Sequence, residues 1–492
     1  MKILMLNPPD QYTVIEHPDE EKKDGDGRFI EAEDYGLFPP LGLLYVLTYL
    51  EQNTEGHEFY FRDCIAEKIS HDDLHDVINE IKPDMVGITS FTIALMDVVL
   101  SARTIRKICP DAHICLGGHH PIAFPLEAAQ LPEFDSIVVG EGEIAFTELV
   151  KCLDSKKDFT SIQGVYTADT IEKWTSAPMK KDKRFLQKVT APPAYIDHID
   201  KIPEPNREYI KHIDYSSIVG VSSKLATMIS SRGCPFKCTF CDIPFKQHRP
   251  RAVELVVDEM ENCIAMGYEE VHFYDDLFNI TSQRIIDICD EIDKRELKIA
   301  WDFRGRVNTV THESLRRAKN SGCRMISFGI EAGTDKSLKV LRKGAKVSHA
   351  KQTLEWCREL GIETIADYML GLPGEDYDDV LQSIQALINF DPDYAQVAIL
   401  TLYPNTQVYD QAVEKGLIED GRWQEFARKP FIGFKVDHWE EKLNLNQLVK
   451  LQKLAYSRFY FRPKYILRSI LKTRSLHQLK SKAFGALKVM NA

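Results

Sequence analysis

The spacing of hydrophobic and polar positions divides the chain into alternating strand-like and helix-like segments. Over the first 150 residues, short apolar runs alternate with longer stretches that carry one apolar face. The runs predict strands at 3–6, 58–62, 85–89, 113–116 and 136–139, and helices at 41–50, 73–81 and 93–108. This alternation is typical of a parallel sheet with helices on both faces. We therefore predict an α/β, doubly wound (Rossmann-like) domain, which binds ligands at the carboxyl ends of its strands.

After this domain the regular pattern stops and then resumes. Residues 151–223 are predicted to be a linker, which is interrupted by Pro192, Pro193, Pro203 and Pro205. From 224 to 407 the pattern predicts six strands, at 226–230, 270–274, 298–303, 325–330, 363–370 and 394–400, each followed by a helix or a turn. Such β/α steps predict a partial (β/α)6 barrel. Residues 408–492 are predicted to be mainly helical.

The length of the chain and its cysteine count indicate the number of domains and the cellular compartment. A chain of 492 residues with 44% hydrophobic content fits two or three globular domains. The beginning of the chain lacks the pattern of a signal peptide, and no apolar run approaches the roughly 18 residues of a membrane span. The cysteine count of 11 is odd and sparse, which favours free thiols and a metal site over disulfides. We expect a cytoplasmic protein.

The charge is acidic overall and basic at one end. A net charge of -12 argues against a nucleic-acid-binding surface. From Leu451 onward, however, the chain has Lys and Arg but neither Asp nor Glu. Such a segment can make peripheral contact with a membrane or guide an anionic substrate. The interpretation that we favour is a helix packed across the barrel with its basic face in solvent.

Three cysteines stand directly after the first strand of the predicted barrel. Cys234, Cys238 and Cys241 lie in the segment SRGCPFKCTFCDIPF, at the end of the barrel where such folds carry their chemistry. Three thiolates leave one iron of a 4Fe-4S cluster without a protein ligand, and an open iron can bind substrate. The alternatives are ordinary reduced cysteines, or a zinc site completed by His248. So close a grouping of a scarce residue favours the cluster.

The three cysteines, Phe240 before the last of them, and their place after a strand resemble the radical S-adenosylmethionine (SAM) superfamily. The resemblance implies that the amino and carboxylate groups of SAM chelate the open iron. It also implies an external electron donor, such as flavodoxin or ferredoxin, whose electron cleaves SAM. The product would be a 5'-deoxyadenosyl radical that abstracts hydrogen from an unactivated carbon.

The same resemblance implies which other residues hold the cofactor. On the second strand, FYDDLFN places Asp275 and Asp276 near the methionine amino group, although the family has glycines there. On the fourth, GIEAG places Glu331 at the ribose hydroxyls, with Lys343 near the methionine carboxylate. Two further assignments concern Asp367 of IADYMLGLPGED, which would point into the barrel ahead of a turn near adenine, and Arg306, which would face the cofactor or pair with an acid.

The first domain has no G-x-G-x-x-G after its first strand and no Walker lysine, so a dinucleotide is disfavoured. Its segments PPLGLLYV, ITSFT, LGGHHP and VVGEGE resemble the cobalamin-binding radical SAM enzymes, in particular the group of the anaerobic magnesium-protoporphyrin ester oxidative cyclase. This implies that Ser90, Gly117 and Gly118 make room for the cobalamin nucleotide tail. The Asp-x-His-x-x-Gly signature of a cobalt-ligating histidine is absent, since residues 63–66 are Asp-Cys-Ile-Ala.

Four polar residues near these segments have more ordinary interpretations. His119 and His120 are expected to be loop histidines without a ligand role, although they could neighbour the corrin. Glu141 and Glu143 are expected to bind backbone amides at the start of a helix.

The resulting hypothesis is a cobalamin-dependent radical SAM enzyme that methylates an unactivated carbon of a small-molecule or lipid-like substrate. One alternative is oxidative cyclase chemistry on a porphyrin-like substrate. An alternative of another class is a non-catalytic cobalamin and iron-sulfur sensor. A tRNA methylthiolating enzyme is disfavoured, because the cysteines of the first domain lack cluster spacing.

Overall fold

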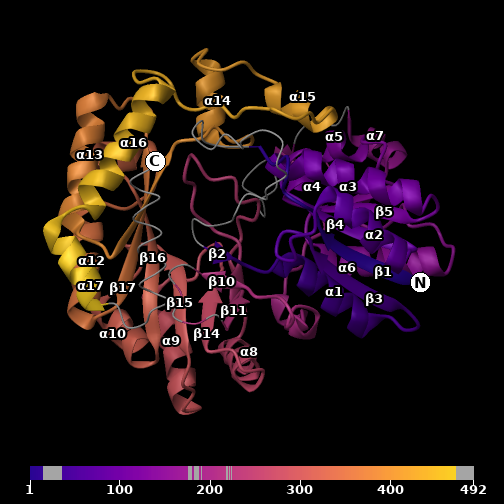
Figure 1. Ribbon diagram of the computed structural model, residues 1–492, viewed down its shortest axis with the longest axis horizontal. Helices are drawn as coiled ribbons and strands as arrows, with labels where there is room; N and C mark the ends of the chain where they lie inside the picture. The colour runs from indigo at the N-terminus through magenta and orange to yellow at the C-terminus, as the bar shows by residue number, and fades with distance from the viewer. Residues whose placement is uncertain are drawn as a thin grey trace. The chain divides into compact units, whose positions relative to one another are not determined.

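The chain folds as two compact units, which are described one at a time (Figure 1). The computed structural model describes residues 1–14, 36–175, 180–181, 188–189, 191–217, 220, 222 and 224–472. The first unit comprises Met1–Ser217 and Glu419–Val436, and the second comprises Ile218–Ile418 and Asp437–Ala492. In the part of the chain that is described, no helix has the length and apolar character needed to cross a membrane.

The first unit is built on a six-stranded sheet with the order β3-β1-β4-β5-β6-β7. Its strands are β1 (Lys2–Asn7), β3 (Glu58–Asp63), β4 (Met85–Ser90), β5 (His113–Gly118), β6 (Ser136–Val138) and β7 (Val165–Tyr166). The first five are parallel and confirm the predicted strands, whereas β7 is antiparallel to β6. The order reverses between β1 and β4, so the ligand crevice of a doubly wound sheet is expected above their carboxyl ends.

Helices cover both faces of this sheet. The longer ones are α1 (Leu41–Asn53), α2 (His71–Ile81), α3 (Leu95–Ile108) and α6 (Gly142–Asp154), and the shorter ones include α4 (His119–Ala123), α5 (Pro125–Ala129) and α7 (Ala168–Thr175). A late segment joins them, because α15 (Arg422–Arg428) packs beside α5 (Figure 1). Arg428 pairs with Glu127 of α5 at 3.4 Å. The region from residue 408 onward is thus divided between the two units.

The second unit contains a parallel sheet of six strands in sequence order, which confirms the predicted partial barrel. Its strands are β11 (Leu225–Met228), β14 (Glu270–Phe273), β15 (Ala300–Gly305), β16 (Cys323–Glu331), β17 (Glu363–Leu370) and β18 (Tyr394–Ile399). The helices are α8 (Val253–Ala265), α9 (Ser282–Lys294), α10 (His312–Asn320), α11 (Asp335–Val340), α12 (Val347–Leu360) and α13 (Tyr377–Phe390). The sequence pattern missed α12.

The two faces of this second sheet differ in character. Alternate strand residues such as Phe273, Phe303 and Phe328 are buried in the core beneath the helices. The residues between them, on the opposite face, are mostly polar, and they include His272, Asp302 and Ser327. Several helices that return over the apolar face begin at a Thr or Asp side chain that accepts a backbone N–H bond, as Asp376 does from Asp379. A polar concave face therefore lies opposite a fully packed outer one.

The C-terminal helices close the free edge of this sheet. They are α16 (Leu445–Tyr460), which packs on β18, and α17 (Pro463–Lys472); α14 (Gln407–Glu414) precedes them in the chain. The Tyr460 hydroxyl accepts from the Ala395 amide at 3.1 Å and donates to its carbonyl at 3.0 Å, and Tyr456 bonds the Val397 amide in the same way at 3.1 Å. The tyrosines thus occupy edge groups of β18 that would otherwise be free to pair with another strand.

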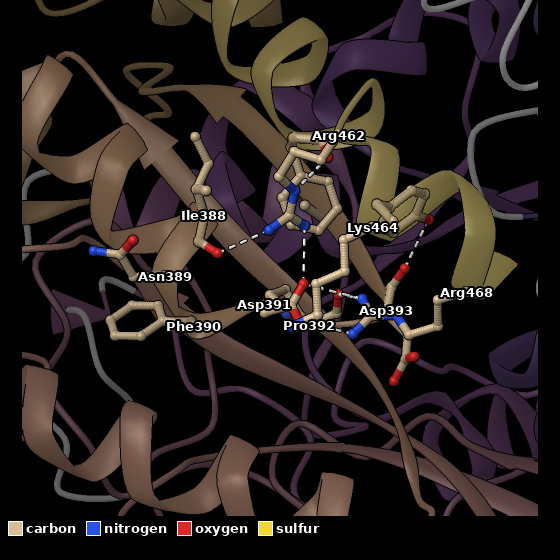
Figure 2. Close-up of polar contacts among 12 residues, drawn as sticks. Ile388, Asn389, Phe390, Asp391, Pro392, Asp393, Arg462, Lys464 and Arg468 are labelled. Atoms are coloured by element: carbon tan, nitrogen blue, oxygen red, sulfur yellow. Dashed lines mark hydrogen bonds and ion pairs between the residues drawn. The ribbon is translucent and has the colours of Figure 1, made fainter.

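Much of the basic charge of this region is used in packing (Figure 2). Asp391, which ends α13, accepts from Arg468 at 2.8 Å and pairs with Arg462 at 3.0 Å, while Lys464 lies 3.9 Å away. This agrees with the packing part of the favoured interpretation for α16 and α17, although Arg462 and Arg468 contact Asp391 rather than lying on a basic face in solvent. Residues 473–492 of the basic segment lie outside the described residues. The surface of α17 nevertheless exposes Leu467 and Leu471, at 61% and 76%.

Candidate functional site

The cysteine loop leaves the carboxyl end of β11 and is closed at its base. Strand β12 (Ser231–Arg232) pairs with β13 (Arg249–Pro250), so the chain returns to where it left. Within the loop, the Cys234 amide donates to the Phe245 carbonyl at 2.9 Å. The three cysteines are half-buried, whereas most of the other cysteines are buried in the core. The local fold therefore presents these thiols at the barrel mouth, as the sequence predicts.

Asp275 and Asp276 hold this loop in place. Both Asp275 oxygens are occupied, by the Ser230 amide at 2.7 Å and by the Ser230 and Ser231 hydroxyls at 2.6 Å. Burial raises the pKa of Asp275 to about 6, against the lowering effect of these serines. Asp276 accepts from the Gly233 amide at 2.7 Å, next to Cys234. The contacts give both carboxylates a positioning role, and their predicted contact with the methionine amino group stays a prediction.

The three thiols are near neighbours without surrounding one atom. Burial raises the pKa of the Cys234 thiol, and raises that of Cys241 to about 12, and in both cases the charge of Cys238 adds to the effect. Among the described residues, no group of three or more His, Cys, Asp or Glu is gathered as a single metal ion requires. A 4Fe-4S cluster places each thiolate on a different iron, and the assignment of these three cysteines as its ligands stays a prediction. His248 is engaged elsewhere, with its ring 3.2 Å from the Leu277 carbonyl, which weighs against the zinc alternative.

Arg306 lies against the cysteine loop. Its Nη1 donates to Cys238 Sγ at 3.6 Å, and its guanidinium lies 3.8 Å from the centre of the Phe236 ring. The backbone is fixed by Asn279, which accepts from the Arg306 amide and donates to its carbonyl, both at 2.9 Å. The Nε and Nη2 donors are buried and have no partner in the structure. Within the described residues Arg306 therefore pairs with no acid, which was one of its two predicted roles, and its other role, facing the cofactor, stays a prediction.

Glu331 and Lys343 form a buried ion pair. Lys343 Nζ donates to Glu331 Oε1 at 2.6 Å, and the two residues are only 6% and 8% exposed. Glu331 adopts a left-handed φ of 70°, beside an irregularity in the pairing of β16 with β17. A Cβ on Gly329 would approach Glu331 Oε1 to 2.4 Å and Lys343 Nζ to 2.7 Å, so the pair needs glycine at that position. The structure thus brings together two residues that the sequence assigned to separate parts of SAM.

Asp367 lies on the concave face, as predicted, and accepts from the Ser327 hydroxyl at 2.8 Å. Burial raises its pKa to about 6, although the nearby charge of Arg304 opposes this. The turn that follows is closed by Glu375, which accepts from the Leu372 amide at 3.0 Å and the Ser337 hydroxyl at 2.6 Å. Two further polar residues of this site, Asn279 and Arg304, were not predicted from the sequence. Asn279 ends the FYDDLFN segment, and Arg304 is two residues before Arg306, so strand alternation could have found the latter.

In the first unit, the predicted cobalamin residues gather at the ends of β4 and β5. Ser90 is buried and donates its hydroxyl to the Phe91 carbonyl at 2.9 Å. Gly118 has a φ of 88°, and a Cβ there would lie 2.7 Å from the Ser90 amide nitrogen. Because Gly118 has no side chain, the ends of β4 and β5 can approach each other closely. Of the two glycines, only Gly117 has open space around it. Both glycines and Ser90 remain proposed cobalamin neighbours.

The other polar residues of this unit that the sequence singled out make contacts within the protein. Asp63 accepts from the Tyr215 hydroxyl at 2.8 Å. The aspartate at the position where a cobalt-binding signature would begin thus has a structural contact. Glu141 accepts from the Ile196 amide at 2.7 Å, a backbone bond as expected, although it leads to the connector rather than to its own helix. His120 is fully buried, with Thr92 Oγ1 3.1 Å from its Nδ1, and burial lowers its pKa to about 3. The His119 ring stacks on Phe91 at 6.0 Å.

Comparison with known proteins agrees with both units. Residues 228–387 match the radical SAM superfamily and residues 27–150 match the B12 binding domain. The chain is 29% identical to an uncharacterized methyltransferase of Pyrococcus horikoshii, over 88% of this chain and 90% of that protein. It is 27% identical to the anaerobic magnesium-protoporphyrin IX monomethyl ester cyclase of Rubrivivax gelatinosus, over 78% and 68%.

The fold is also that of a solved structure. The radical SAM methyltransferase TsrM of Kitasatospora setae, with tryptophan substrate and a SAM analogue bound, aligns with a TM-score of 0.63 at 20% identity. The alignment covers 84% of this chain and 76% of TsrM. The fold and the cysteine site thus define a radical SAM enzyme. More particularly, the chain combines a radical SAM domain with a B12 binding domain, and the cofactors of these two domains are a 4Fe-4S cluster, SAM and cobalamin.

Proposed function

We propose that this enzyme transfers a methyl group to an unactivated carbon of a small-molecule substrate. The observation that carries the proposal is the cysteine loop at the mouth of the barrel, with the unpartnered donors of Arg306 beside Cys238. The similarity over most of the chain to a methyltransferase supports methyl transfer as the reaction. When bound, the cluster and SAM supply a 5'-deoxyadenosyl radical for hydrogen abstraction, and cobalamin supplies the methyl group.

The residues of this chain then have defined tasks. Cys234, Cys238 and Cys241 hold the cluster, and Asp275 keeps their loop in register through the serines after β11. Arg306 offers two buried N–H donors to an anionic group, which the methionine carboxylate satisfies best because a guanidinium can bind both carboxylate oxygens. Lys343 is already paired with Glu331, so in this proposal it orients Glu331 toward the ribose rather than binding the carboxylate itself.

The experiment is a label-transfer assay with holoenzyme prepared without oxygen. Enzyme, reductant, methyl-labelled SAM and a small-molecule extract of the source cells are incubated, and 5'-deoxyadenosine and labelled products are measured. We expect both, together with the loss of both in Cys238→Ala. Formation of 5'-deoxyadenosine with no label in any product would refute methyl transfer. A protein that produces no 5'-deoxyadenosine at all would instead support the non-catalytic sensor.

Oxidative cyclisation is the second candidate, because the chain is also similar to the magnesium-protoporphyrin ester cyclase. The same assay separates the two reactions. Cyclisation of a porphyrin ester gives an unlabelled product that has lost hydrogen, whereas methylation adds the label. An unlabelled product that forms only when enzyme, SAM and reductant are all present would favour the cyclase reaction.

The setting of the enzyme belongs to the same proposal. We place it in the cytoplasm, with flavodoxin or ferredoxin as electron donor, since free thiols and a reducible cluster suit a reducing compartment. The exposed Leu467 and Leu471 beside basic residues also support a peripheral membrane contact. Because α16 closes the edge of the sheet, the suitable variant keeps the chain whole and replaces Leu467 and Leu471 by Gln. Equal pelleting of this variant and the wild type with anionic vesicles would refute the membrane contact of α17.

A further inference from the structure

The concave face of the second sheet carries a second polar layer, one step deeper than the residues discussed so far. Side chains two positions apart on a strand share a face, so Arg304 lies on the same face as Arg306. Arg304 is opposite Ser327 in the β15 and β16 register, and Asp367 is opposite Gly329 in the β16 and β17 register. Arg304 is thus level with Ser327, whereas Asp367 is level with Gly329 and reaches Ser327 through its carboxylate at 2.8 Å. The three side chains together make up one polar layer beneath Arg306 and Glu331.

Arg304 is a solvent-exposed cation in this layer. Its guanidinium carbon lies 5.0 Å from the centre of the Tyr274 ring, on which it rests. Within the described residues it makes no hydrogen bond or ion pair, so its N–H donors are free to meet a ligand. A guanidinium supported on an aromatic face keeps a fixed orientation, because the ring restrains a long and otherwise mobile side chain.

Asp367 supplies the opposite charge without neutralising it. One oxygen accepts from Ser327 at 2.8 Å, and across the described residues Asp367 makes no ion pair with Arg304. Their charges nevertheless influence each other, since Arg304 opposes the rise in the pKa of Asp367. On the strand between them, Gly329 has no side chain, and the space over it is occupied by the ion pair of Glu331 and Lys343.

The charges below this layer are already paired. Arg324 contacts Glu270 at 2.6 Å, Glu363 at 3.4 Å and Asp302 at 3.5 Å, and His272 contacts Asp302 as well. Those carboxylates are thus committed to Arg324 and His272. Among the described residues, Arg304 and Asp367 are opposite charges on this face that have not paired with each other.

We propose that Arg304 and Asp367 bind the substrate, and that the substrate is a small polar molecule with an anionic group beside a hydrogen-bond donor. The anionic group, a carboxylate or a phosphoryl group, meets the guanidinium in a bidentate pair. An adjacent hydroxyl or ammonium donates to Asp367. A purely hydrocarbon substrate would strip water from both charges and leave them unpaired, which disfavours it strongly. The inference rests on the proposed function for the identity of this face as the substrate side.

Binding of simple probes to the holoenzyme tests this directly. The probes are 2-aminoethylphosphonate and 3-hydroxypropionate, which present the two anionic chemistries, and 1,3-propanediol as their neutral counterpart. We expect calorimetry to detect at least one anionic probe at millimolar concentration. Arg304→Gln should weaken that probe tenfold or more, and Asp367→Asn should weaken it as well. The control Arg316→Gln changes an exposed arginine of α10 and should leave binding unaltered.

Three results would overturn the proposal: equal binding by wild type and Arg304→Gln, equally tight binding of propanediol, or no binding of either anionic probe to wild type. Folding of each variant is checked by cluster content and circular dichroism. The label-transfer assay keeps the two proposals separate. Normal probe binding without label transfer refutes methylation alone, whereas label transfer with probe binding that ignores Arg304 refutes this inference alone.

Discussion

Removing Lys343 tests whether the buried ion pair at the barrel mouth is built as the structure indicates. Its partner Glu331 is only 8% exposed, and the two side chains are 2.6 Å apart. Without Lys343 the carboxylate stays buried with no counter-charge, and such a loss typically costs about 3–5 kcal/mol. We therefore expect Lys343→Met to lower the free energy of unfolding by an amount in that range.

The matched control is Lys336→Met. Lys336 also pairs with an acid, Asp379, at 2.8 Å, but its side chain is 60% exposed. Exposed pairs contribute about 0–1 kcal/mol, so this variant should be nearly as stable as wild type. Urea unfolding of the reconstituted proteins measures both values. Equal destabilisation by the two substitutions would refute the argument from burial.

A double variant separates stability from chemistry. Glu331→Gln combined with Lys343→Met removes both charges and keeps similar volumes, so it should recover at least half of the stability lost in the single variant. SAM cleavage should remain impaired, because the proposed ribose contact is gone. A double variant as unstable as the sum of the two singles would show that the pair does not act as a unit.

Three further predictions follow from other contacts. Asp275 has a folded-state pKa of about 6, above the ordinary value of about 3.9, so it favours folding below pH ~4 and this contribution is lost as the pH rises through about 6. The unfolding free energy of wild type relative to Asp275→Asn should therefore fall by about 2 kcal/mol from pH 4 to pH 7, and a flat difference would contradict the pKa. Arg306→Gln should weaken SAM binding by about 10- to 150-fold, the loss expected for a bond of about 1.5–3 kcal/mol to a charged group, with Arg316→Gln as the unaffected control in a SAM-binding titration. Tyr460→Phe leaves the amide and carbonyl of Ala395 without their partner and should destabilise the protein by about 1–3 kcal/mol in urea unfolding, whereas exposed Tyr377→Phe should not.

The fold could be predicted where hydrophobic periodicity is strong. The parallel strands of both sheets are buried on one or both faces, so runs such as Ile3–Leu6 identify them without reference to the rest of the chain. Helix α12 was missed because it follows α11 without an intervening strand, which breaks the β/α alternation. The crossing of residues 419–436 to the first unit depends on tertiary packing of Trp423 and Phe426, which local periodicity does not encode.

The site could be predicted as a set of residues, but not as a set of contacts. The spacing of the cysteines reveals their chemistry because the ligands are neighbours in sequence. In contrast, the pairing of Lys343 with Glu331 and the engagement of Asp275 by two serines depend on side-chain directions across strands. Resemblance assigned each of these residues to SAM individually, whereas the structure shows that Asp275 and Lys343 already have protein partners.

Whether a polar residue of the barrel already has a protein partner determines whether it is available to a ligand. Residues whose charges are satisfied by the protein, such as Asp275 and Arg324, fix geometry and can be replaced only at a cost in stability. In the part of the chain that the structure describes, Arg306 and Arg304 have no such partner; Arg306 has buried donors, and Arg304 is exposed on the concave face. Because buried donors are rarely left without a partner in native proteins, Arg306 is best explained by a ligand absent from the protein chain itself. Arg304, two residues earlier on the same strand, extends the same reasoning from the cofactor to the substrate.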